Sequence, residues 1–142
     1  GVDSLMTQLA RCCKPAPPDA IRGFVTRGKG VSIHRSDCPS FRQLALPDPG
    51  RVIDVEWGRA KAEGAVLYPV AVSVEAADRQ GLLRDISEVF AKERCNVIGV
   101  QTQSVKGQAY MTFTVEVSDS SRLGKVLVLI REVAGVRSAR RR

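Results

Sequence analysis

Residues 68–117 of this 142-residue chain alternate between two hydrophobic periods, and this alternation restricts the possible folds more than any other feature. Residues 68–76 place valines at every second position, which is the period of a strand with one buried face. Residues 82–92 place apolar side chains three and four positions apart, which is the period of an amphipathic helix. Two further strands are predicted over 96–105 and 109–117, so the element order begins β-α-β-β.

The pattern continues beyond these strands. Ser120 and Ser121 can cap a second helix over 123–132, and residues 135–139 predict a final strand. The order β-α-β-β-α-β is that of the ferredoxin-like fold, in which one antiparallel sheet carries two helices on one face. The other face and the edges of such a sheet can pair with a second copy or another domain. Many functions use this fold, so the order predicts an architecture and no function.

The preceding part of the chain predicts a smaller unit. Two short strands over 21–26 and 31–34 flank a glycine-rich turn at 27–30, which is the pattern of a β-hairpin. A short helix is predicted over 38–44, with residues 36–37 offering an N-cap before it.

The remaining segments complete the division of the chain. Residues 5–13 have at most a short helical pattern, which the prolines of the next segment end. Residues 51–57 alternate apolar and polar side chains and predict a strand, followed by an exposed turn or linker. The chain is therefore assigned to the α+β class. We divide it into a β-hairpin and helix domain, a strand with a linker, and a ferredoxin-like domain: residues 1–50, 51–67 and 68–142.

Four side chains of the first domain have metal-binding chemistry: Cys12, Cys13, His34 and Cys38. Thiolate and neutral imidazole are donors that suit tetrahedral zinc, and a structural metal would compensate for a domain too small to bury a large core. Adjacent cysteines point in different directions, so both can bind one ion only if the backbone is distorted. Alternatively, the thiols pack as small apolar side chains and His34 makes a surface contact.

Composition excludes several classes of protein. A content of 44% hydrophobic and 26% charged residues excludes a disordered or fibrous chain. No apolar run reaches the ~18–20 residues that span a bilayer. A single histidine, with no Ser/His/Asp spacing, argues against an autonomous hydrolase.

The chain is basic, with 22 Lys and Arg against 15 Asp and Glu, a net charge of +7. Seven basic and four acidic residues give +3 to residues 1–50, whereas twelve and eight give +4 to residues 68–142. Arg27 and Lys29 lie at the predicted hairpin turn, a composition that favours contact with a phosphate backbone. The same charges also increase solubility, so charge alone leaves both interpretations open.

Two sets of motifs carry a resemblance to known families. Residues 78–86 (DRQGLLRDI) and 96–97 (NV), together with the element order, resemble an ACT domain, a regulatory module that often binds amino acids. Residues 10–15 (ARCCKP) and 23–38 (GFVTRGKGVSIHRSDC) resemble the conserved-cysteine, zinc-finger-like domain of the RelA/SpoT family. In this order the pair resembles the C-terminal regulatory region of (p)ppGpp synthetases of the RelA-like branch, over essentially the whole chain.

The resemblance implies a fragment without catalytic activity, an expectation that agrees with a chain that begins at Gly1. The parent would be a cytoplasmic stringent-response enzyme, a GTP pyrophosphokinase (ATP:GTP 3'-diphosphotransferase) whose catalytic domains lie upstream. Relatives dock on the ribosome, contact ribosomal RNA and sense deacylated tRNA. Four residues of this chain match the expected RNA-contacting positions: Arg27, Lys29, His34 and Arg35.

The resemblance also implies ligands for both domains. The conserved-cysteine domain would hold a structural Zn²⁺ on the cluster of cysteines and histidine. ACT domains of some relatives bind branched-chain amino acids, which places a ligand near Asp78, Gly81, Leu82 and Asn96. Homodimerisation through the ACT domain and contacts with the upstream catalytic domains are further expectations, and no membrane partner is expected.

Overall fold

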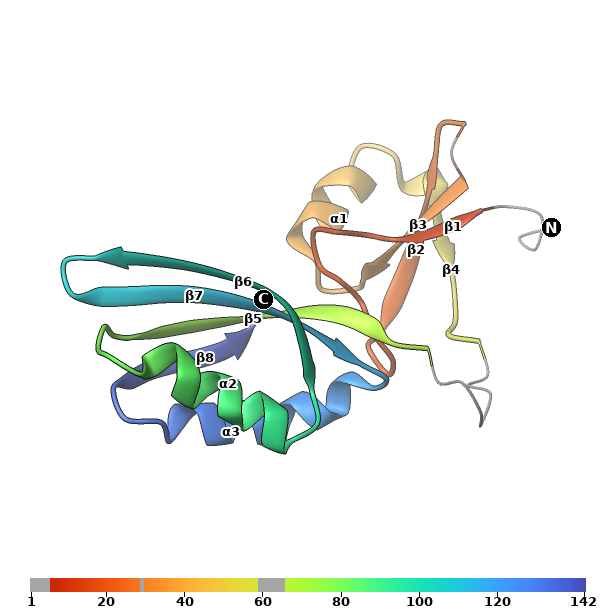
Figure 1. Cartoon of the computed structure of the whole chain (residues 1–142). Coiled ribbons are helices and arrows are strands. Elements are labelled where there is room, and N and C mark those ends of the chain that lie inside the picture. The colour runs from red at the N-terminus through yellow and green to blue at the C-terminus, as the bar shows by residue number, and fades with distance from the viewer. Residues whose placement is uncertain (1–5, 29, 59–65) are drawn as a thin grey trace. The chain divides into compact units, whose positions relative to one another are not determined.

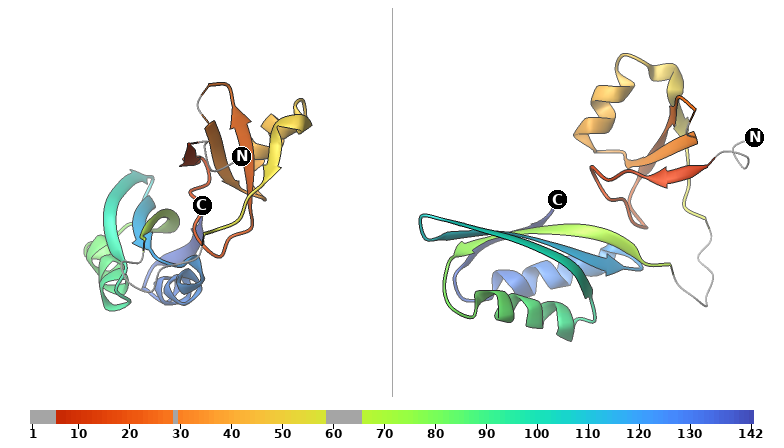
Figure 2. Two further views of the ribbon diagram at one scale, coloured as in Figure 1. Left: turned by 90° about the vertical axis from the view of Figure 1, so that its right-hand side faces the viewer. Right: turned by 45° about the horizontal axis from the view of Figure 1, so that its top comes forward.

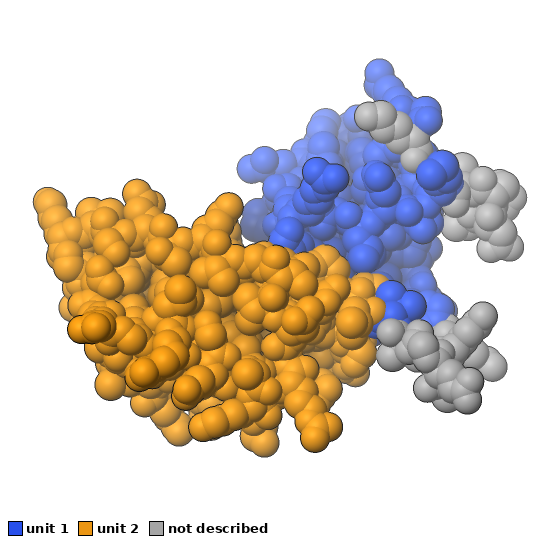
Figure 3. Space-filling view, in the orientation of Figure 1, with its two compact units in different colours: residues 1–66 blue, residues 67–142 orange. Residues whose placement is uncertain are grey.

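The computed structural model describes residues 6–28, 30–58 and 66–142, and the chain divides into two compact units, Gly1–Val66 and Leu67–Arg142 (Figures 1 and 3). Both units combine strands with helices, which confirms the α+β class. In the described part of the chain, no helix combines the length and the apolar character needed to cross a membrane.

The first unit is built on a four-stranded sheet with the spatial order β1-β3-β2-β4 (Figure 1). Its centre is the predicted antiparallel hairpin of β2 (Ile21–Thr26) and β3 (Gly30–Arg35). β4 (Val52–Asp54) pairs with the outer side of β2, so part of the strand predicted over 51–57 belongs to this sheet.

The segment before the first cysteine is a strand, so the helical pattern read in residues 5–13 was wrong for the described residues. β1 (Thr7–Leu9) runs parallel to β3, and the pairing continues where the N–H of Ala10 donates to the carbonyl of Ile33 at 2.8 Å. The free edge of β3 supplies backbone partners for this short segment. Such partners override the weak helical preference of a few residues.

The short helix α1 (Pro39–Ala45) confirms the helix predicted after the hairpin, with proline in its first turn. Cys38 occupies the N-cap position, one residue beyond the predicted 36–37. Phe41 is the buried residue of α1 and packs in a small apolar cluster with Phe24, Cys13 and Cys38. Two of these four residues are cysteines of the candidate metal site, so this site overlaps with part of the apolar core of the unit.

The second unit has the predicted β-α-β-β-α-β order, in a fully antiparallel sheet of spatial order β6-β7-β5-β8. Its strands are β5 (Tyr68–Ala77), β6 (Asn96–Val105), β7 (Gln108–Val117) and β8 (Val136–Arg141). Its helices are α2 (Leu82–Lys92) and α3 (Leu123–Arg131), and the short 3-10 helix η3 (Ser120–Arg122) directly precedes α3. The first unit has one such 3-10 helix among its described residues, η2 (Pro49–Arg51), directly before β4. Figure 2 shows α2 and α3 on the same face of the sheet.

The core of the second unit lies between this sheet face and the helices. The valines of β5 are fully buried, as are Ile86 and Phe90 of α2. The rings of Phe90 and Phe113 pack with centroids 5.1 Å apart. The predicted serine cap is replaced by Asp119, whose carboxylate accepts from the N–H of Ser121 at 2.7 Å and leaves the serines inside η3.

Candidate metal centre

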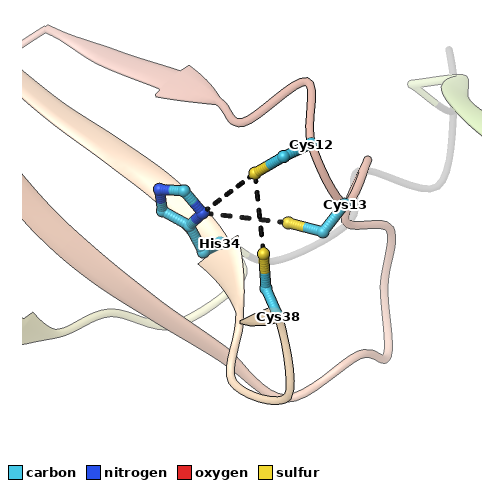
Figure 4. Close-up of side chains that lie close together, drawn as sticks. All are labelled: Cys12, Cys13, His34 and Cys38. Atoms are coloured by element: carbon cyan, nitrogen blue, oxygen red, sulfur yellow. Dashed lines mark hydrogen bonds between the residues drawn. The ribbon is translucent and has the colours of Figure 1, made fainter. Parts of the chain in front are cut away.

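The four predicted ligands of the first unit come from three separate segments and point toward one another (Figure 4). Cys12 and Cys13 lie in the turn after β1, His34 lies in β3, and Cys38 precedes α1. Their sulfur atoms and a ring nitrogen all lie within 4.8 Å of one another, and together they form a possible metal-binding site.

The separations within the cluster can be compared with those of a metal tetrahedron. Cys12 Sγ lies 3.5 Å from His34 Nδ1 and 3.5 Å from Cys38 Sγ, and Cys13 Sγ lies 3.9 Å from His34 Nδ1. With Zn–S of ~2.3 Å and Zn–N of ~2.0–2.1 Å, the edges of a zinc tetrahedron are roughly 3.6–3.8 Å. The residues therefore fit zinc in donor type and number, and these three separations lie close to the edges of its tetrahedron.

The two adjacent cysteines converge without the conflict expected from the sequence. Opposite directions apply to neighbours in a strand, but residues 11–13 form a turn, which the N–H of Lys14 closes by donating to the carbonyl of Ala10 at 3.1 Å. Lys14 itself has a positive φ of 45°. This tight turn carries both thiols toward β3.

Burial and neighbouring groups together determine the ionisation of the thiols. Cys13 is 5% exposed, and burial raises the pKa of its thiol to about 12. Burial, followed by the neighbouring Cys38 thiol, raises the pKa of Cys12. Burial also raises the pKa of Cys38, but the backbone N–H of Phe41 in the first turn of α1 and the neighbouring thiols outweigh it, and the net pKa is below its ordinary value. Without metal, at least two of the thiols are protonated at neutral pH.

The histidine has the protonation state that a metal ligand requires. His34 is 4% exposed, and its ring packs against Phe41 with centroids 5.5 Å apart. Burial lowers the pKa of its imidazole, so the neutral ring is present at pH 7. The alternative of a surface contact by His34 does not match this burial.

The three described members of the predicted RNA-contacting set, Arg27, His34 and Arg35, do not share one exposed surface. Arg27 is exposed at the hairpin tip, beside Gly28 with its φ of +77°, and Lys29 lies outside the described residues. His34 belongs to the buried cluster, and the side chain of Arg35 is only 17% exposed. Of the described candidates, Arg27 alone projects into solvent.

In the second unit, three of the four predicted ligand-binding residues line one cavity of about 320 Å³: Asp78, Gly81 and Leu82. Gly81 holds the N-cap position of α2 with a φ of +81°, and the Asp78 carboxylate accepts from Ser104 Oγ at 2.8 Å. Asn96 is not among the residues lining this cavity. It lies at the start of β6, where its Nδ2 donates to Glu116 Oε1 at 3.0 Å.

A salt bridge that the sequence does not indicate lies at this cavity, between Arg79 and Asp85. Arg79 donates to Asp85 Oδ2 at 2.8 Å and to the carbonyl of Ala134 at 3.0 Å, so one guanidinium joins the start of α2 to the turn before β8. The hydrogen bond from Arg79, followed by that from Arg84, lowers the pKa of Asp85. Arg79 lies in the loop after β5 and Asp85 lies in the first turn of α2, so neither a helical nor a strand period applies across the pair, and no pattern could have indicated it.

Comparison with known proteins gives matches over both units. Residues 1–58 match the family described as the RelA/SpoT RIS domain, and residues 64–141 match the ACT domain. A GTP pyrophosphokinase of Escherichia coli (strain K12) is 43% identical over 143 residues, covering 99% of this chain and 19% of that protein. A GTP pyrophosphokinase of Streptomyces coelicolor is 42% identical over 137 residues, covering 96% of this chain and 16% of that protein.

A solved ACT domain from a GTP pyrophosphokinase of Chlorobium tepidum aligns with 54% of this chain and 100% of its own length, with a TM-score of 0.49 and 18% identity. The chain spans less than a fifth of the length of the two curated relatives described, at 19% and 16%.

Proposed function

Because the chain belongs to the ACT-domain family through residues 64–141 and carries a RelA/SpoT RIS domain over residues 1–58, we propose that it is the regulatory region of a GTP pyrophosphokinase that contacts the ribosome. The observation that carries this proposal is the pairing of both domains within a chain that is 43% identical, over 99% of its length, to a GTP pyrophosphokinase. In this role the chain binds ribosomal RNA near deacylated tRNA and controls (p)ppGpp synthesis by catalytic domains of the same cytoplasmic protein.

The surface of the first unit supports contact with RNA. Arg11, Arg27 and Arg42 are exposed, and among the described residues they take part in no side-chain ion pair. Arg22 is partly exposed and pairs with Asp54 at 3.3 Å. Arg27 is exposed next to the end of β2, where its guanidinium can reach a phosphate backbone.

The metal centre has a structural part in this proposal. Bound zinc would join the turn after β1, strand β3 and the start of α1, and thereby fix the sheet that presents the hairpin tip. The residues that would hold it are Cys12, Cys13, His34 and Cys38, whose donors fit a closed four-coordinate site.

Ribosome binding of the 142-residue chain as a function of salt concentration tests the proposal. We expect weak binding that falls steeply with salt, and Arg27→Ala should reduce the slope of log K against log salt by roughly 0.7–0.9, the value of one phosphate contact. Arg137→Ala, an equal change of charge on an exposed residue of β8, is the matched control and should leave the slope unchanged. Binding that is absent or independent of salt would overturn the proposal.

The cavity at the start of α2 favours a second function, amino-acid sensing. Its volume of about 320 Å³ lies at the lower end of the usual range for small-molecule sites, and the free N–H groups of a helix N-terminus can receive a carboxylate. Leu82 and Met111 supply apolar contacts for a branched side chain. Calorimetry with leucine, isoleucine and valine should give saturable heat, with the D-enantiomers as controls. No heat at millimolar concentrations would exclude this function.

Dimerisation through the ACT domain is proposed from the edge strand β6. This ten-residue strand exposes Ile98, Val100 and Val105, and exposed apolar edges favour pairing with another strand. Sedimentation equilibrium should show a dimer, and Val100→Lys should shift it to monomer. A monomer at all concentrations would contradict this part of the proposal.

A further inference from the structure

Arg35 joins the two loops that carry three of the four candidate ligands. Its Nη1 donates to the carbonyl of Cys13 at 3.4 Å, and its Nε donates to Asp37 Oδ1 at 3.2 Å. Cys13 lies in the turn after β1, whereas Asp37 directly precedes Cys38. A single guanidinium therefore links the turn of Cys12 and Cys13 to the approach of Cys38.

The backbone of the same residue also contacts ligands on both sides. The N–H of Arg35 donates to Cys13 Sγ at 3.3 Å, and its carbonyl accepts from the N–H of Cys38 at 3.0 Å. These backbone bonds persist whatever side chain occupies the position. Substitution of Arg35 therefore removes only the guanidinium contacts and leaves the backbone contacts in place, which makes the side chain's part measurable.

The positive charge of Arg35 also favours a part of this residue in the metal site. Three thiolates and one neutral imidazole around a divalent zinc ion give the site a net charge of about −1, and a nearby cation compensates it. The guanidinium of Arg35 is a cation that contacts a ligand residue, through the Cys13 carbonyl. Its side chain is only 17% exposed, whereas that of its partner Asp37 is 69% exposed.

We propose that Arg35 is a positioning residue of the metal centre and that its part in phosphate contact is secondary. The inference rests on the proposal that the cluster holds zinc. The guanidinium fixes the relative positions of Cys13 and Cys38 before the ion arrives, so less ordering of the two loops is required on binding. Partners outside the ligand set typically change metal affinity by about 10–100-fold when removed.

Competition with a chelator tests this assignment in the purified chain, with the d–d absorption of Co²⁺ in the cluster as the readout of metal binding. Arg35→Ala should weaken Co²⁺ and Zn²⁺ binding about 10–100-fold. Arg35→Lys keeps the charge and loses the two-pronged geometry, so it should recover only part of this loss. Asp37→Asn should weaken binding less, and adding it to Arg35→Ala should have no further effect, because both changes break one link.

The control is Arg27→Ala, which has the same change of charge at an exposed position and should leave metal affinity unchanged. Conversely, zinc-loaded Arg35→Ala should keep the salt slope of ribosome binding that Arg27→Ala reduces. A purely structural role of Arg35 would lower the melting temperature of the metal-free chain as much as that of the loaded chain, whereas positioning lowers mainly the loaded one.

Two outcomes distinguish the positioning role of Arg35 from the proposal that the cluster holds zinc. Wild-type binding of Co²⁺ with Arg35→Ala within twofold of wild type would overturn the positioning role alone. A wild-type chain without affinity for either metal would overturn the zinc proposal and the positioning role together.

Discussion

Zinc binding to this chain should release between two and three protons per ion at pH 7–8, and the affinity should therefore rise steeply with pH. Thiols bind zinc as thiolates, so each thiol that is protonated in the metal-free chain loses a proton on binding. Burial holds the pKa of Cys13 at about 12, and the pKa of Cys12 is also raised, so both begin protonated. Cys38 has a lowered pKa and contributes up to one further proton.

The magnitude follows from these protonation states. Burial lowers the pKa of His34, so its neutral ring releases no proton in this range. With two to three protons released, the affinity should rise by roughly 100- to 1000-fold from pH 7 to pH 8, or about 2.7–4.1 kcal/mol. The sign is fixed by the raised pKa values, because a lower pH restores the protonated thiols and weakens binding.

Chelator competition at pH 7.0, 7.5 and 8.0 measures the slope of log K against pH. Calorimetry in buffers of different ionisation enthalpy counts the same protons independently. Cys13→Ser should lower the count by about one, since it removes one titrating ligand. A slope below one in the wild-type chain would refute the reasoning, because it would mean that the protonated thiols of Cys12 and Cys13 are not the ligands.

The second unit gives three further expectations. Phe90→Ala should lower the free energy of unfolding by about 3–5 kcal/mol in urea titrations, since the ring is fully buried against Phe113; retention of wild-type stability would contradict the described core. Gly81→Ala should destabilise the fold by about 1 kcal/mol, because the φ of Gly81 is +81°. Gly124→Ala in α3, where a Cβ meets open space, should stabilise the fold by up to about 1 kcal/mol. A change of Tm in the same direction for both variants would contradict this. The hydrogen bond from Arg79 lowers the pKa of Asp85, so this carboxylate stabilises the fold above its ordinary pKa, and the contribution is lost as the pH falls. Asp85→Asn should therefore flatten the decline of Tm between pH 5 and pH 3. An unchanged decline would count against the Arg79–Asp85 pair.

The parts of the fold that follow from periodicity could be predicted from the sequence. The valines of β5 and the apolar stripe of α2 specify both their elements and the faces that they bury, and the glycine-rich turn specifies the hairpin of the first unit. β1 could not be predicted in this way. Its three residues form a strand because the edge of β3 offers backbone partners, and these partners are contributed by residues more than twenty positions away.

In the candidate site, too, the sequence predicts some features, whereas others depend on tertiary contacts. Ligand chemistry identified Cys12, Cys13, His34 and Cys38, but the convergence of two adjacent cysteines depends on a turn with a positive φ at Lys14. The position of Arg35 next to a ligand did not indicate its contacts either. Whether an arginine faces solvent or a neighbouring carbonyl depends on tertiary packing, and neither charge nor motif spacing predicts that packing.

The most direct test of zinc binding by the cysteine and histidine cluster is the zinc K-edge X-ray absorption spectrum of the purified chain, combined with its zinc content. We expect one zinc ion per chain, with three sulfur ligands at ~2.3 Å and one nitrogen ligand at ~2.0–2.1 Å, and loss of this shell in Cys13→Ser and Cys38→Ser. Zinc well below one per chain, a shell dominated by oxygen, or an unchanged spectrum in both variants would contradict it.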